Sequence, residues 1–146
     1  MKLTQLFLAT SLTTLALTSP IYANAAQDNG HAAMGHGSSA SKMFLEKRDI
    51  DGYSVSFHVM AANQGMQYGG SHNLMIKVES QGKSLGNIRA NSKVVFPDGK
   101  DQSKPLQKVG DWYVTGYDLK PGSKHQLMVL FMTADGKKHF GGVNYQ

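Results

Sequence analysis

Apolar and polar residues alternate with a period of two through most of the chain after Met43. In the stretch 53–61, the odd-numbered positions are mainly aromatic or aliphatic, whereas the even-numbered positions between them hold Ser, His and Met. This alternation is typical of a half-buried β-strand, and helical periodicity is nearly absent. The pattern therefore predicts an all-β domain.

We expect about seven strands, separated by turns rich in Gly, Pro, Asn and Asp. The run 127–132 is apolar on both faces, which predicts a central strand. Strands at this spacing indicate a β-sandwich. The segment 117–122 resembles the corner between the two sheets of immunoglobulin-like domains, so the expected fold is an immunoglobulin-like β-sandwich. The expected strand ranges are 53–61, 72–79, 88–96, 106–109, 112–117, 125–133 and 137–145.

The dipeptide Asp135-Gly136 lies between the last two apolar runs, which is a strong signal for a β-hairpin. If the turn holds two residues, Met132 and His139 are directly opposite each other. Their Cβ atoms would then lie about 4.5–5.5 Å apart, so the pair could share one ion.

The first 25 residues have the organisation of a secretory signal, with a basic start at Lys2, an apolar stretch over 6–17 and small residues before Ala25. We expect cleavage after Ala25 and export, most simply to a bacterial periplasm. An uncleaved anchor is the weaker alternative, because a spanning helix needs about 20 apolar residues. The released chain would then have no membrane span.

Residues 26–42 are rich in Ala, Gly and Ser and have no apolar period. Such a segment cannot bury enough surface to offset its chain entropy, so we expect a disordered tail. The expected organisation is therefore a signal peptide over 1–25, a tail over 26–42 and one sandwich domain over 43–146.

The amino-acid composition limits the kinds of metal site that this domain can form. The 146 residues include no Cys, eight Met and six His, and the net charge is +5. Without Cys there is no disulfide, no thiolate-bound zinc or iron–sulfur site and no type 1 copper site. Thioether and imidazole groups suit Cu(I), and imidazole also suits Cu(II) and other transition metals.

The Met and His residues fall into several candidate metal sites. In the tail, His31, Met34 and His36 lie within six residues of one another. In the domain, pairing of the first two expected strands would bring Met60 and His72 together, with Met66 in the loop between them. The reserve candidates are His58, Met75, Met132 and His139. The alternative is that each Met is core packing and each His an isolated surface group.

Other function classes have less support in the sequence. No pair of acidic residues is placed for acid–base catalysis and no nucleophile elbow is present, so we do not expect an enzyme. Basic residues are scattered without interleaved aromatic residues, which argues against a nucleic-acid partner.

Six segments within residues 50–146 carry a family resemblance: 57–60, 72–75, 95–99, 112–119, 127–131 and 138–142. Together they are similar to the YtkA-like group of small exported bacterial domains and, more distantly, to CopC-like copper carriers. This resemblance implies an immunoglobulin-like fold and an association with copper or other heavy metals.

The hypothesis is therefore an exported copper carrier, chaperone or buffer. It would act as a monomer and could exchange metal with another envelope protein. The rival is an immunoglobulin-like interaction or accessory domain of an envelope complex with no metal site.

Overall fold

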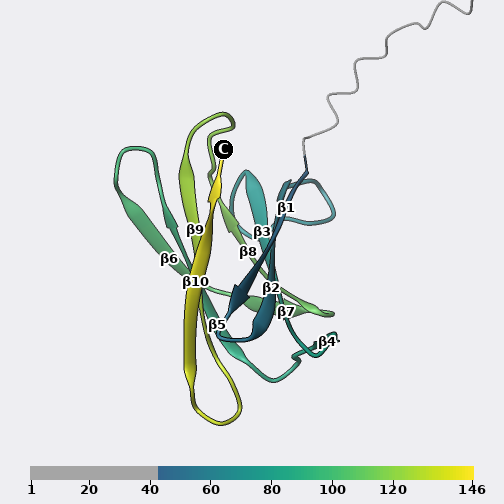
Figure 1. Cartoon of the computed structure of the whole chain (residues 1–146). Helices are drawn as coiled ribbons and strands as arrows, with labels where there is room; N and C mark the ends of the chain where they lie inside the picture. Colours follow the sequence, from purple (N-terminus) through teal and green to yellow (C-terminus); the bar gives the residue numbers. More distant parts are fainter. Residues whose placement is uncertain (1–42) are drawn as a thin grey trace, which may run out of the picture. The chain divides into compact units, whose positions relative to one another are not determined.

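The computed structural model describes residues 43–146 (Figure 1). These residues form strands, turns and loops without a helix, so none of them forms a helix that could cross a membrane. The strands are β1 (Phe44–Ile50), β2 (Tyr53–Ala61), β3 (His72–Ser80), β4 (Lys83–Ser84), β5 (Arg89–Val95), β6 (Asp101–Pro105), β7 (Gln107–Val109), β8 (Trp112–Tyr117), β9 (His125–Met132) and β10 (Lys138–Tyr145).

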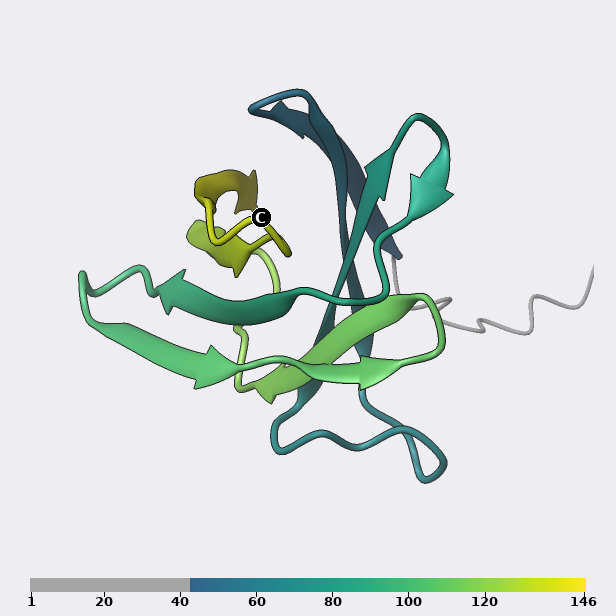
Figure 2. The ribbon, with the colours of Figure 1, turned by 90° about the horizontal axis from the view of Figure 1, so that it is seen from below.

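The strands form two antiparallel sheets. One sheet has the order β1-β2-β3-β8-β7, with β4 paired to the end of β3, and the other has the order β10-β9-β5-β6. Figure 2 shows β9 and β10 on one side of the molecule and β1 to β3 on the other. The segment between β8 and β9 passes from one sheet to the other, as expected for residues 117–122.

Side chains from one face of each sheet fill the space between the two sheets. Fully buried side chains from β2 and β3, such as Phe57 and Ile76, face Leu127 and Phe131 from β9. Period-two alternation explains this arrangement, because every second residue of these strands is apolar and points inward. The core therefore confirms the predicted β-type patterning and a two-sheet architecture.

The strand count differs from the expectation, because the described residues form ten strands. Each of the seven expected ranges contains or nearly matches an observed strand, and β9 is central as expected. The additional strands β1, β4 and β6 have mostly polar sequences. They pair at the borders of the sheets, where a strand buries little apolar surface and leaves little alternation in the sequence.

The predicted register of the last hairpin is wrong by one residue. His139 pairs with Phe131 and not with Met132. The turn has three residues rather than two: the Thr133 amide donates to the Lys137 carbonyl at 3.0 Å, and Gly136 has a φ of +81°. A type I turn followed by a left-handed Gly accommodates Asp-Gly as well as a two-residue turn does. The shift turns His139 toward the core.

Burial of Tyr117 predicts a loss of stability at alkaline pH. Its hydroxyl lies 2.8 Å from the Ser92 hydroxyl between the sheets, and burial raises the pKa of Tyr117 above its ordinary value of 10.0. The unfolded chain therefore loses this proton at a lower pH than the folded protein. The stabilising contribution is complete below about pH 10 and falls as pH rises toward the raised pKa.

Tyr117→Phe should reduce this loss, which urea unfolding at pH 8 to 11 would measure. The free energy of unfolding of the parent should fall more steeply with pH, by up to about 1.4 kcal/mol per pH unit. Equal slopes for parent and variant would contradict the assignment.

Candidate metal centre

Met and His side chains gather on the face of β2 and β3 that points away from the core, called here the outer face. The core face carries Val55, Phe57 and Val59, so strand alternation turns His58 and Met60 outward. His58 pairs with Met75 of β3. Directly opposed residues share a face and have Cβ atoms about 4.5–5.5 Å apart, so an imidazole and a thioether are neighbours here.

Two further Met residues border this pair. Met60 lies two residues after His58 on the same face, a spacing of about 6.5–7 Å, and it pairs with Asn73. The Asn73 side chain donates a hydrogen bond to the Met66 carbonyl at 2.6 Å. This bond holds the loop 62–71 against the outer face, so the backbone of Met66 lies beside Met60 and Asn73.

Packing against β8 also fixes the loop 62–71. A Cβ atom added to Gly116 would lie 2.6 Å from the carbonyl carbon and oxygen of Tyr68, so only Gly allows this approach. The Lys104 ammonium donates to the Gly69 carbonyl at 3.1 Å and also to the Gly116 carbonyl. The loop that carries Met66 is therefore fastened from two sides.

The indole ring of Trp112 packs beside His58 on the outer face. Trp112 of β8 is half-buried, and its ring centroid lies 5.7 Å from that of His58. Strand β3 separates β2 from β8, so these two side chains meet above β3. The Lys77 ammonium lies 5.3 Å from the centroid of the Trp112 ring.

Three buried polar atoms on this face have no hydrogen-bond partner among the described residues: His58 Nε2, Ser56 Oγ and Asn73 Oδ1. Ser56 is 1% exposed and Asn73 is fully buried. Almost every buried polar group in a protein is paired with protein or ordered water, so these three atoms leave hydrogen-bonding capacity on this face for water or a ligand. No other buried side-chain nitrogen or oxygen in residues 43–146 lacks a partner.

Burial also sets the protonation state of His58. It removes water from the imidazole and lowers the pKa of His58 below its ordinary value of 6.5. The ring is therefore neutral at neutral pH. A neutral imidazole has the lone pair that a metal requires.

The donors on this face suit a soft ion. Imidazole nitrogen and thioether sulfur carry no charge and favour Cu(I) over hard, oxygen-seeking ions. Within residues 43–146, no three His, Asp or Glu side chains converge in a way that would hold a metal by themselves. A metal on the outer face would therefore depend on the Met residues.

The structure does not bring the first-choice pair together on one face. Met60 and His72 both line a hollow of about 810 Å³ at the end of the sandwich. However, Met60 pairs with Asn73 and His72 pairs with Ala61, so strand alternation directs their side chains to opposite faces of the sheet. The His72 Nδ1 atom is 2.9 Å from the Ser71 hydroxyl.

The pair Met132 and His139 is also separated, because of the corrected register. Met132 points outward from the four-stranded sheet, in the row of Arg89 and Lys138. His139 is 7% exposed and points inward. Its Nδ1 atom lies 2.9 Å from Asp51 Oδ2 and its Nε2 atom 3.2 Å from Thr133 Oγ1.

Asp51, His139 and Thr133 are connected in the order of a catalytic triad. Their hydrogen bonds, however, are those of a contact that stabilises the fold. The Asp51 side chain is 63% exposed, whereas His139 is buried. The Thr133 hydroxyl donates to Asp135 at 2.5 Å, so its proton is not directed at His139. These bonds connect the β1–β2 turn to the β9–β10 hairpin and hold the two sheets together at this end.

Asp51→Ala should destabilise the fold without changing metal binding. It leaves the buried His139 Nδ1 without its partner, which costs about 1–3 kcal/mol. Urea denaturation would measure this loss, and a copper titration should match that of the parent. A large loss of copper affinity would show that His139 belongs to the metal site.

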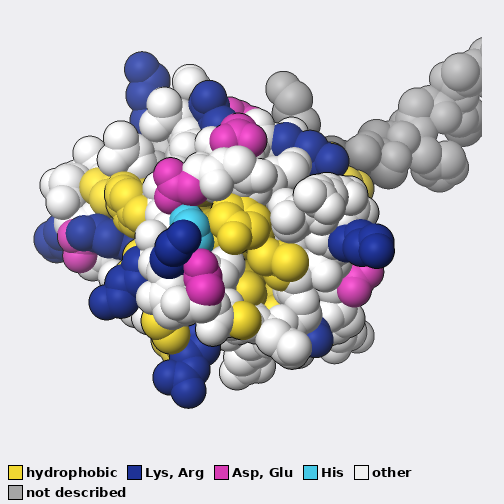
Figure 3. Space-filling view, turned by 60° about the horizontal axis from the view of Figure 1, so that its bottom comes forward, with side chains coloured by type: hydrophobic (Ala, Val, Ile, Leu, Met, Phe, Trp, Pro, Cys, Tyr) yellow, Lys and Arg dark blue, Asp and Glu magenta, His cyan; other side chains and the backbone are white. Residues whose placement is uncertain are grey.

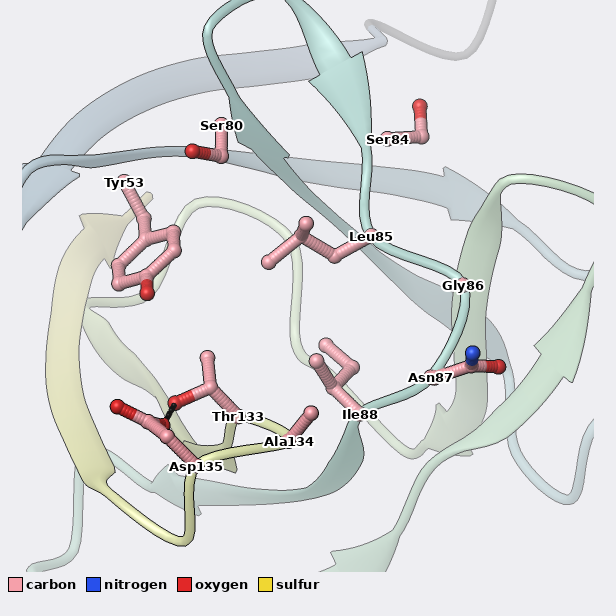
Figure 4. A pocket seen from close by; sticks show the side chains of 10 residues that line it. All are labelled: Tyr53, Ser80, Ser84, Leu85, Gly86, Asn87, Ile88, Thr133, Ala134 and Asp135. Atoms are coloured by element: carbon pink, nitrogen blue, oxygen red, sulfur yellow. Dashed lines mark hydrogen bonds between the residues drawn. The ribbon is translucent and has the colours of Figure 1, made fainter.

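A separate hollow of about 390 Å³ lies beside this cluster (Figure 4). The side chains of Tyr53, Leu85 and Ile88 line it together with Thr133 and Asp135. Figure 3 shows that hydrophobic side chains reach the surface at the lower end of the molecule, bordered by acidic and basic groups. This hollow contains neither Met nor His and offers no soft ligand.

The tail candidates His31, Met34 and His36 lie outside the described residues. The sequence analysis did not identify Trp112 as a neighbour of His58. Alternation along β8 could have indicated its orientation. Because Tyr113 is a core residue, the neighbouring Trp112 must point outward.

No family model, curated protein or solved structure matches this chain. Its function is therefore inferred from its own residues.

Proposed function

We propose that this chain is an exported carrier, chaperone or buffer for copper, with its main site on the outer face of β2 and β3. His58 and Met75 would bind the ion directly, and Met60 and Met66 would complete the set. We also propose an immunoglobulin-like sandwich and a periplasmic location, which the sequence pattern and the signal-like segment support.

The buried His58 Nε2 atom without a partner is the observation that carries this proposal. It lies on the same face as Met60 and Met75, and Met66 is held above that face. A buried nitrogen with no hydrogen bond is costly. A metal ion would remove that cost, because the lone pair would then form a bond.

Transport rather than catalysis fits the character of the site. The proposed ligands are neutral and lie on the outer face of the sheet, not in the core between the two sheets, and Met75 is 9% exposed. Preorganised strands lose less entropy on binding than a tail does, so the domain should bind more tightly than residues 26–42. The tail would then serve as a weaker second site.

Titration of the secreted chain with Cu(I) against a chromogenic chelator tests the proposal. We expect two phases, and replacing His31, Met34 and His36 together should remove the weaker one. Bound copper should also raise the melting temperature: a ligand at 100 times its Kd adds about 2.7 kcal/mol of stability. Absence of competition and of any thermal shift with Cu(I), Cu(II) and Zn²⁺ would contradict the proposal.

The second candidate function is an interaction domain without a metal. The observation that favours it is a pair of exposed apolar side chains, Leu130 and Phe140, directly opposite each other on the outward side of the four-stranded sheet. Such groups can mark a protein interface. The titration separates the two functions, because the interaction domain would bind no copper.

A further inference from the structure

We infer that the Trp112 indole forms one side of the metal site. We also infer that the Lys77 ammonium packs on the face of this indole when no metal is bound. This inference rests on the proposed function. It assigns the ligand class, a monovalent soft cation such as Cu(I) or Ag(I). It also assigns a competitor within the chain.

A cation of the chain itself already lies over the Trp112 ring. The Lys77 ammonium lies 5.3 Å from the centroid of Trp112, within the range of a cation–π interaction. The Lys77 side chain is only 24% exposed, so this cation is partly withdrawn from water. The indole face is therefore already a binding surface for a single positive charge.

The Trp112 ring lies beside the proposed ligands. Trp112 contacts His58 from across β3, and the strand between them carries Met75 and Lys77 on its outer side. Met75 and Lys77 are two residues apart, about 6.5–7 Å along the strand. His58, Met75 and Trp112 therefore occupy neighbouring positions on the outer face.

The positive charge of Lys77 opposes a second cation at the same ring. An ion bound to His58 and Met75 would lie close to the Lys77 ammonium, and two cations that share one ring repel each other. Lys77 can leave the ring without losing its other partner, because its ammonium is 3.2 Å from Glu79. Metal binding and contact between Lys77 and Trp112 should therefore exclude each other.

The same arrangement favours a single positive charge on the ion. The proposed ligands are all neutral, so nothing they contribute balances a second charge. The ring attracts cations but does not neutralise them, and Lys77 is positive itself. A divalent ion such as Zn²⁺ should bind this face weakly.

Lys77→Gln provides the sharpest variant, and Lys47→Gln is its matched control. Lys47 also lies near Glu79, at 3.7 Å, and pairs with Ser56 on the same face, but it is not placed over the ring. Removing Lys77 should tighten Ag(I) and Cu(I) binding about fivefold, in keeping with the strength of a cation–π contact. Removing Lys47 should change the affinity much less.

Fluorescence gives an independent readout, because Trp112 is the only Trp of the chain. The experiment uses the secreted chain with His31, Met34 and His36 replaced, titrated with silver nitrate or with Cu(I), while a chelator reports occupancy. Emission from Trp112 should be quenched in proportion to occupancy. Trp112→Leu should weaken Ag(I) binding and reduce the preference over Zn²⁺, and Trp112→Phe should restore part of both.

The outcomes separate this inference from the proposed function. Two results would overturn the inference and leave the carrier function standing, provided that the chelator assay shows metal binding. One is unchanged Trp112 emission, and the other is an equal effect of Lys77→Gln and Lys47→Gln on the affinity. No metal binding to the parent chain would overturn both.

Discussion

Replacing His58 by Ala together with Met75 by Leu is expected to abolish the tight phase of Cu(I) binding. The two side chains are opposed on β2 and β3. In the proposed site they would provide the nitrogen and one sulfur. Loss of a residue that only supports a ligand costs about 10- to 100-fold in affinity, so loss of two ligands should cost more than about a hundredfold. Chelator competition measures this change.

The matched control replaces one His and one Met outside the outer face: His72→Ala with Met132→Leu. His72 points to the other side of the sheet and Met132 belongs to the other sheet. The control should keep the tight phase and a cooperative thermal melt. If the control lost the tight phase while His58→Ala with Met75→Leu kept it, the site would not be on the outer face.

Gly116→Ala should have the largest effect on stability. The added methyl group would meet the Tyr68 carbonyl at 2.6 Å, and this neighbour is backbone that cannot rotate away. Either the loop 62–71 moves off the outer face or β8 shifts, at a cost of about 3 kcal/mol. Because the loop carries Met66, copper affinity should fall as well.

Gly65→Ala is the control for this substitution, since it lies in the same loop and has free space. Its added Cβ would be 3.7 Å from the Asn63 side chain, an ordinary contact, and Gly65 is not among the residues with positive φ. Urea denaturation and copper titration of both variants test the prediction. Equal stability of Gly116→Ala and the parent would show that the loop is not clamped against β8.

The parts of the site that depend on local periodicity were predictable from sequence. Alternation along a strand places His58 and Met60 on one face whatever the rest of the fold does. The same argument assigns the core face of β2, and the structure confirms it.

Contacts between strands were harder to predict, because they depend on register. The partner of His58 is decided by how the loop 62–71 returns to β3, and its return places His72 opposite Ala61 rather than Met60. In the last hairpin, Asp135-Gly136 is compatible with two turn geometries that differ by one residue. A shift of one residue exchanges the two faces of a strand, and this removed His139 from Met132.

The contact of Trp112 with His58 could not be derived from strand patterns alone. It requires the order of strands in the sheet, with β3 between β2 and β8, and that order joins segments far apart in the chain. Parity indicates that Trp112 points outward, but only the topology shows which residues it meets.

Nuclear magnetic resonance of a chain comprising residues 26–146 with ¹³C-labelled Met methyl groups, titrated with Ag(I), tests the central claim most directly. The methyl signals of Met60, Met66 and Met75 should shift together as the first equivalent binds, while those of Met128 and Met132 stay unchanged. Saturation of Met34 or Met132 before any change at Met75 would contradict a metal site on the outer face of β2 and β3.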